Sequence, residues 1–210
     1  MHKKAIIFDF DGTLANTIPY IYEVANELAE KHGFQRVSQD QFNQLRNKSP
    51  FEIIDELQIP LLKIPFILNE GRKLLKKHII NVLYIEGMQD VLVELKKQGL
   101  IIGILTSNSR QNIDVFLKHN PSITFDFIYT ERNIFGKQFS LRNIIKKEKL
   151  NLAETIYVGD EVRDVESCHA LELDVIAVTW GFGTKESLKK YKPTFIVNKP
   201  REMLSILLSS

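Results

Sequence analysis

Ala5-Ile6-Ile7-Phe8-Asp9-Phe10-Asp11-Gly12-Thr13-Leu14 sets the architecture of the chain, because a short apolar run passes directly into two acids and a glycine. The β-branched and aromatic residues of this run, bounded by Gly12, predict a buried strand. Asp9 and Asp11 point the same way while the strand lasts, since an i, i+2 pair shares one face. Two carboxylates there suit a hard divalent cation, and one of them could be a nucleophile. An Asp-Gly turn without chemistry is the alternative.

A second apolar run, residues 100–105, ends in hydroxyl and amide side chains. Thr106-Ser107-Asn108-Ser109 follows it and precedes a helical pattern. Side-chain donors and free backbone N–H groups at such a position can bind an anion. The simpler interpretation is an N-cap, in which Ser107 or Ser109 only closes the start of the next helix.

Two later segments repeat this arrangement. Gly136-Lys137 comes before a predicted helix over 138–149, and Lys137 is either a site residue or one of many solvated cations in a chain with 28 Lys and Arg. The apolar run 154–158 leads into Gly159-Asp160-Glu161-Val162-Arg163-Asp164, which again places acids after a strand. We therefore expect four polar segments at strand ends, where an open parallel α/β sheet binds its ligands.

The region between the first strand and residue 85 shows helical periodicity only. After Gly87, strands and helices alternate about every 20–30 residues, which indicates parallel crossovers. The sequence therefore predicts an α/β core of residues 1–15 and 85–210, with a helical cap inserted at 16–84. Cap and turn residues predict helices over 18–31 with Gly33 after it, from Ser38, from Ser49-Pro50, and from about Pro60 to His78.

In this order, the motifs resemble those of the haloacid-dehalogenase-like superfamily. The first is DxDGT at 9–13, the second is Thr106, the third is Lys137 and the fourth is GDxxxD at 159–164. Residues 178–183 are also similar to the phosphoglycolate-phosphatase-like branch. The resemblance implies a Rossmann-like parallel sheet with a small helical cap between the first two motifs. It implies a phosphatase that acts on a small phosphorylated metabolite, a phosphoglycolate-like monoester.

The resemblance also implies a role for each acid of the first motif. Asp9 would be the nucleophile that forms an aspartyl phosphate, and Asp11 the general acid and later the base. The implied cofactor is Mg²⁺, held by the Asp9 carboxylate, the backbone carbonyl of Asp11, and Asp160. Asp164 would act behind these ligands, orienting Lys137 or a metal-bound water.

The remaining motifs would bind the transferring group. By the same resemblance, Thr106 with the backbone of Ser107 and Asn108 would bind the phosphoryl oxygens, and Lys137 would balance the charge of Asp9. A sugar phosphomutase on the same scaffold and a catalytically silent binding protein are the alternatives. The GDxxxD pattern favours a phosphatase over a mutase, and the presence of every required side chain argues against a silent protein.

Substrate selection is expected at the loop 44–49 of the cap. Arg46 and Lys48 lie there near a helix N-terminus, where they could bind a negatively charged substrate tail once the cap closes. The alternative is that both are ordinary solvated residues.

Composition limits the remaining possibilities. The near balance of 28 basic and 26 acidic residues, with a net charge of +2, gives no reason to expect nucleic acid or an acidic membrane as partner. The single cysteine, Cys168, cannot form an internal disulfide and favours a reducing cytoplasm. Apolar stretches fall short of membrane-spanning length. A monomer is expected, with a dimer as the alternative.

Overall fold

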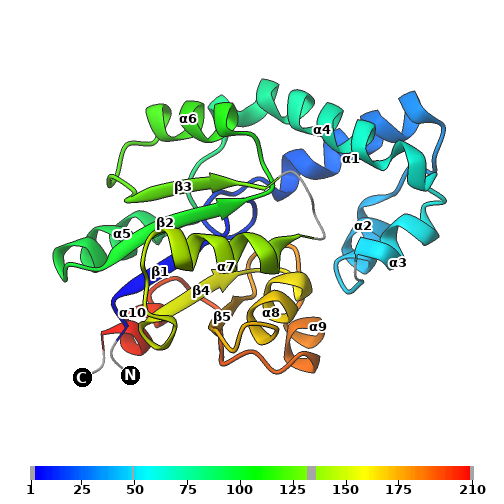
Figure 1. The fold of residues 1–210 in the computed structure, drawn as a ribbon. Helices are drawn as coiled ribbons and strands as arrows, with labels where there is room; N and C mark the ends of the chain where they lie inside the picture. The colour runs from blue at the N-terminus through cyan, green and yellow to red at the C-terminus, as the bar shows by residue number, and fades with distance from the viewer. Residues whose placement is uncertain (1–2, 49, 132–135, 209–210) are drawn as a thin grey trace.

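The computed structural model describes residues 3–48, 50–131 and 136–208, which fold around one parallel sheet (Figure 1). Its strands are β1 (Ala5–Phe8), β2 (Ile101–Thr106), β3 (Phe127–Thr130), β4 (Thr155–Gly159), β5 (Asp174–Val178) and β6 (Phe195–Val197). They lie in the order β3-β2-β1-β4-β5-β6, and every neighbouring pair is parallel. β1 is central, since Ala5 pairs with both Ile101 of β2 and Thr155 of β4.

Helices cover both faces of the sheet, and alternate residues of β1 point to opposite faces. Ile6 and Phe8 pack with helices α5 (Met88–Lys97), α6 (Arg110–His119) and α10 (Glu202–Leu207). Ile7 packs with helices α7 (Lys137–Lys147), α8 (Val162–His169) and α9 (Lys185–Lys190). A strand covered on both faces is apolar throughout, which explains the uninterrupted run at 5–8. Short 3₁₀ turns are η1 (Leu61–Lys63), η2 (Ile79–Asn81) and η3 (Leu152–Glu154).

A group of helices lies beyond the sheet, on the side to which the strand arrows of Figure 1 point. It comprises α1 (Ile18–His32), α2 (Gln39–Leu45), α3 (Pro50–Glu56) and α4 (Ile64–His78). Val24 and Leu28 of α1 pack against Ile67 and Leu74 of α4 in an apolar cluster of their own. This cluster gives the helical group an interior that is separate from the core of the sheet.

The two chain segments that join this helical group to the sheet lie side by side. The N–H of Asn16 donates to the Leu83 carbonyl over 2.9 Å, and Ala15 forms an antiparallel bridge with Tyr84. Paired segments of this kind can act as a hinge between two bodies. We therefore propose that residues 16–84 form a cap that moves relative to the core.

The structure confirms the predicted fold class and most of the predicted helix starts. Ser38 begins α2 by accepting a hydrogen bond from the Gln41 N–H over 3.2 Å, and Gly33 ends α1 with a φ of 75°. Ser49, the expected start of the third helix, lies outside the described residues. The expectation that Lys137 follows a strand end is wrong, because β3 ends at Thr130 and Lys137 is the first residue of α7.

Candidate active site

Asp9 lies directly after β1, at the middle of the carboxyl edge of the sheet. Its side chain is buried, and its Oδ1 accepts a hydrogen bond from the Phe10 N–H over 2.7 Å. Its Oδ2 accepts from Nζ of Lys137 over 2.9 Å. The same ammonium donates to Asp164 and lies 5.3 Å from the centre of the Tyr157 ring. Lys137 is therefore fixed between the carboxylate of Asp9, directly after β1, and that of Asp164, in the first turn of α8.

Three buried carboxylates meet at this edge of the sheet. Asp9, Asp160 and Asp164 each offer an oxygen atom within 4.8 Å of the other two. The ammonium of Lys137 supplies one positive charge beside these three carboxylates. A buried charge without a compensating partner destabilises the folded state. A donor set made of carboxylate oxygens suits a hard divalent cation such as Mg²⁺. These residues therefore fit a divalent metal ion.

The loops around Asp160 are shaped to its carboxylate. Its Oδ1 accepts from the Thr13 hydroxyl over 2.7 Å, and its Oδ2 accepts from the Phe182 N–H over 2.6 Å. A Cβ atom at Gly12 would lie 2.4 Å from Oδ2, and one at Gly181 would lie 2.2 Å from it. Gly12 also has a φ of 75°, a conformation that favours glycine. Both glycines are required for the backbone to approach Asp160 this closely.

Asp11 is oriented by Asn108. Nδ2 of Asn108 donates to both carboxylate oxygens of Asp11, over 3.0 and 3.1 Å. Oδ1 of Asn108 accepts from the Ser109 N–H and from Nδ2 of Asn112, each over 2.8 Å, so the amide is itself held in place. The carboxylate of Asp11 therefore lies against the segment that follows β2 and takes no part in the cluster of three acids.

The environment sets the protonation of these groups. Burial, reinforced by the charge of Asp9, raises the pKa of Asp11 to about 7. Burial also raises the pKa of Asp9 to about 6, although Lys137 opposes the shift. Burial alone would lower the pKa of Lys137, but Asp164 and Asp9 outweigh it and raise that pKa. Near neutral pH, Asp11 can therefore carry a proton while Lys137 stays charged.

The residues expected to bind phosphate lie beside Asp11. Thr106, the last residue of β2, is fully buried, and its Oγ1 accepts from the Asn108 N–H over 3.0 Å. Thr106 is not among the described residues that line the cavity described below. The carbonyl of Ser107 accepts from Nε of Arg72 over 2.7 Å, which connects this segment to α4 of the cap.

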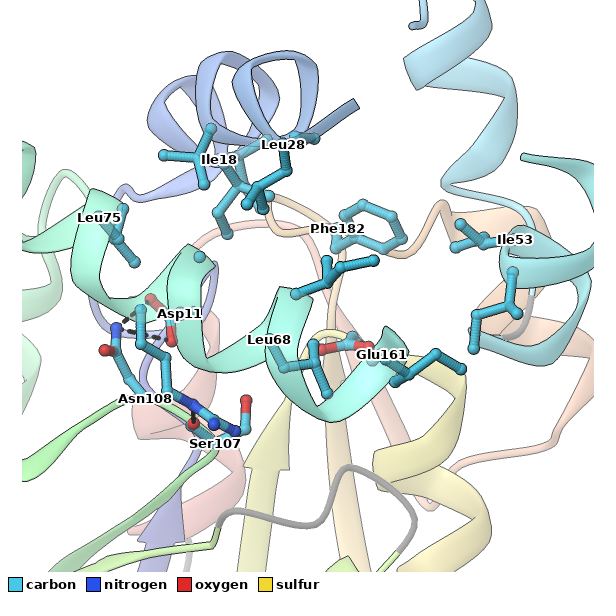
Figure 2. Close-up of a pocket in the computed structure, with 18 of the residues that line it drawn as sticks. Asp11, Ile18, Leu28, Ile53, Leu68, Leu75, Ser107, Asn108, Glu161 and Phe182 are labelled. Atoms are coloured by element: carbon cyan, nitrogen blue, oxygen red, sulfur yellow. Dashed lines mark hydrogen bonds between the residues drawn. The ribbon is translucent and has the colours of Figure 1, made fainter. Parts of the chain in front are cut away.

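A cavity of about 360 Å³ lies between the acids and the cap (Figure 2). Asp9, Asp11, Ser107 and Asn108 line its polar part, so four of the predicted site residues share one space. Lys137, Asp160 and Asp164 lie behind that wall, within the buried cluster. The geometry joins residues from four separate parts of the sequence, which begin at Asp9, Ser107, Lys137 and Asp160.

The described residues that line this cavity do not include Arg46 or Lys48. Arg46 donates from Nε to the Phe182 carbonyl over 2.8 Å and from Nη2 to the Gly181 carbonyl over 2.7 Å. Lys48 pairs with Glu56 within the cap. In this conformation, Arg46 connects the cap to the same loop whose backbone binds Asp160.

This geometry predicts that Arg46→Ala lowers kcat/KM for phosphoglycolate and for p-nitrophenyl phosphate by similar factors, roughly tenfold, because two charged hydrogen bonds between cap and core are lost. Steady-state kinetics with both esters measures the two factors. Arg36→Ala, which removes an exposed cap arginine paired with Glu30, is the control. A selective rise in KM for phosphoglycolate, which carries a carboxylate in addition to its phosphate, would instead support direct substrate binding by Arg46.

Some residues at the site are not among those that sequence reasoning selected. Arg72 is one of several cations on an amphipathic helix, and its long-range bond to Ser107 distinguishes it. Arg163 pairs with Glu161 over 2.6 Å, and both side chains line the cavity. Trp180 donates from Nε1 to the Thr13 carbonyl over 3.1 Å, which supports the loop after the first motif.

Comparison with known proteins agrees with this geometry. Residues 6–178 match the family model described as haloacid dehalogenase-like hydrolase. The chain is 33% identical over 202 residues to the phosphoglycolate phosphatase of Synechococcus elongatus, covering 96% of this chain and 95% of that protein. It is 25% identical to the pyrophosphatase PpaX of Bacillus mycoides, covering 99% and 98%. The solved structure of a haloacid dehalogenase-like family hydrolase from Streptococcus pneumoniae superposes with a TM-score of 0.79, at 22% identity and with coverage of 97% and 98%.

The chain therefore belongs to the haloacid dehalogenase-like hydrolase family. This confirms the resemblance drawn from the four motifs, as well as the expectation of a hydrolase. It also gives the buried acids a family context, since they occupy the positions on which the resemblance rested.

Proposed function

We propose that the protein is a Mg²⁺-dependent phosphatase that hydrolyses a small phosphomonoester through an aspartyl phosphate on Asp9. The observation that carries this proposal is the pairing of two unlike carboxylates at one end of the cavity. Asp9 is held by Lys137, while Asp11 has a pKa of about 7 and is aimed by Asn108. Pairs of acids whose environments differ in this way divide the roles of nucleophile and proton donor.

In the first step, an oxygen of the Asp9 carboxylate attacks the phosphorus atom as the ester P–O bond breaks. Asp11 transfers its proton to the leaving alkoxide oxygen, so that an alcohol is released. The Thr106 hydroxyl and the backbone N–H of Ser107 hydrogen-bond the phosphoryl oxygens, and Lys137 offsets the negative charge near Asp9. The backbone N–H of Asn108, which donates to Thr106 Oγ1 in this conformation, orients that hydroxyl. The product of this step is an aspartyl phosphate with a deprotonated Asp11.

In the second step, Asp11 removes a proton from a water molecule, whose oxygen attacks the same phosphorus atom. The bond between the phosphorus and Asp9 breaks, inorganic phosphate leaves, and both acids return to their starting states. Asn108 keeps the carboxylate of Asp11 in one place for both proton transfers. A phosphomutase would instead pass the phosphoryl group to a sugar hydroxyl.

Asp9, Asp160 and the backbone carbonyl of Asp11 would hold Mg²⁺, with Asp164 behind them. When bound, the ion neutralises charge on the transferring phosphoryl group. The all-oxygen donor set and its excess of negative charge support this assignment. Because the acids are otherwise left without sufficient positive charge, metal binding should also stabilise the fold.

We expect saturating Mg²⁺ to raise the midpoint of thermal unfolding by roughly 5–10 °C, since a ligand at 100 times its Kd adds about 2.7 kcal/mol. Scanning calorimetry with Mg²⁺ or with a chelator measures this shift. Asp160→Asn should lose most of it, because a metal ligand becomes neutral. Asp90→Asn, on the exposed start of α5, should keep it. A full shift in the Asp160 variant would contradict the assignment.

Hydrolysis of p-nitrophenyl phosphate tests the proposal. Release of phosphate in the presence of Mg²⁺, lost in excess chelator and recovered on adding the metal back, is the expected result. A silent binding protein would release none, and a mutase would need a sugar acceptor. Phosphoglycolate is the reference natural ester, because the relative from Synechococcus elongatus bears that name.

We also propose a cytoplasmic monomer with a small phosphorylated metabolite as its partner. The lone Cys168 is buried, as expected for a structural thiol, and the near-zero net charge supports a small substrate instead of nucleic acid. Within the described part of the chain, we find no helix with both the length and the apolar character needed to cross a membrane.

A further inference from the structure

The cavity above the acids has two chemically different ends. Figure 2 shows Asp11, Asn108 and Ser107 gathered at one end, while Ile53 and Phe182 lie away from them. Aliphatic side chains of the cap make up most of the remaining wall, among them Ile18, Leu28, Ile64 and Leu68. If the phosphoryl group lies against Asp9 and Asp11, the rest of the substrate is surrounded largely by hydrocarbon.

The charged residues of the cavity wall are engaged with one another or with the polar end. Arg163 pairs with Glu161 over 2.6 Å, and Arg72 donates to the Ser107 carbonyl, beside the segment expected to bind phosphate. Neither Arg46 nor Lys48 is among the described residues of the wall. A second anionic group on the substrate would therefore lose its water against aliphatic side chains, which is costly without a compensating partner.

We infer that the substrate carries an apolar alkyl or aryl group in place of a second charged group, an inference that rests on the proposed phosphatase activity. A cavity of about 360 Å³ is at the small end of the range for ligand pockets, so it suits a group of several carbons. Each methylene buried there is expected to raise kcat/KM about three- to fourfold, mainly by lowering KM.

A substitution at Leu68 best distinguishes loss of substrate contact from loss of packing inside the cap. The neighbouring Ile67 also lines the cavity but is buried against Val24 inside the cap as well, so a substitution there would disturb packing. Leu68 itself is half-buried and lines the cavity. Leu62, also in the cap and 90% exposed, offers a matched control for the same substitution.

The test measures kcat/KM for methyl, propyl and pentyl phosphate and for phosphoglycolate. From methyl to pentyl phosphate, kcat/KM should rise roughly 100-fold. The kcat/KM for pentyl phosphate should also be higher than that for phosphoglycolate. Leu68→Asn should lower the ratio of pentyl to methyl phosphate about tenfold, because a polar amide replaces hydrocarbon. Leu62→Asn should leave this ratio at the wild-type value. A flat series, or a preference for phosphoglycolate, overturns the inference.

Calorimetry with methyl-, propyl- and pentylphosphonate separates this inference from the proposed activity, because these analogues bind without being hydrolysed. Affinity should rise with chain length, with an increasingly negative heat-capacity change. If none of the esters is hydrolysed but affinity for the phosphonates still rises with chain length, the apolar site is supported and the proposed activity is rejected. If affinity is independent of chain length, the apolar site is rejected whatever the hydrolysis assay shows.

Discussion

Asp9→Asn is expected to lower the rate of hydrolysis of every phosphomonoester by roughly 10,000-fold or more, because an amide cannot form the aspartyl phosphate. The variant should fold normally. The oxygen of an asparagine can still accept the hydrogen bond from the Phe10 N–H, and the substitution removes one of three clustered negative charges. Phosphate release in a purified variant measures the loss, and circular dichroism checks the fold.

The matched control for this variant is Asp114→Asn, which makes the same chemical change in an exposed ion pair with Arg110 on α6. Its activity should equal that of the wild type. Brief incubation with ³²P-labelled substrate followed by acid quenching should label the wild-type protein and leave the Asp9 variant unlabelled. Wild-type turnover by a well-folded Asp9 variant would rule out the assigned nucleophile.

The fold was predictable because its main signals are local. The run at 5–8 and the polar residues directly after it sufficed to predict β1 as a buried strand with Asp9 after it. The central position of β1 comes from its pairing with β2 and β4, which local sequence does not encode. Lys137 was misplaced relative to the strands, since a lysine after a glycine does not show whether a strand or a loop precedes it. The structure begins α7 at that residue, so the ammonium reaches Asp9 from a helix N-terminus.

The expectation that Arg46 binds substrate illustrates what sequence spacing cannot supply. The partners of Arg46 are backbone carbonyls more than 130 residues away, and carbonyls have no sequence signature. The apolar cavity could not be predicted from the sequence either. Helical periodicity identifies Ile67 and Leu68 as apolar positions of α4, but only the packing shows that both line a cavity and that Ile67 also packs inside the cap. Substrate class therefore had to be inferred from the structure.

Asp11→Asn is expected to lower turnover of an alkyl phosphate by roughly 100- to 10,000-fold, the usual effect of removing a positioned proton donor. The amide can still form a hydrogen bond with Asn108, and Asp11 lies outside the cluster of three acids, so the fold and the carboxylates proposed to hold the metal should be retained. The physical reason for the loss is that an alkoxide is a poor leaving group unless it is protonated as the P–O bond breaks.

p-Nitrophenyl phosphate separates the two roles of Asp11, because p-nitrophenolate leaves without a proton. With this ester, the first step of the Asp11 variant should remain fast, while attack by water on the aspartyl phosphate becomes slow for want of a base. Stopped-flow measurements should then show a burst of p-nitrophenolate equal to the enzyme concentration, followed by slow turnover. If the variant is equally slow from the first turnover with both esters, Asp11 acts mainly by shaping the site, and its assignment as acid and base is wrong.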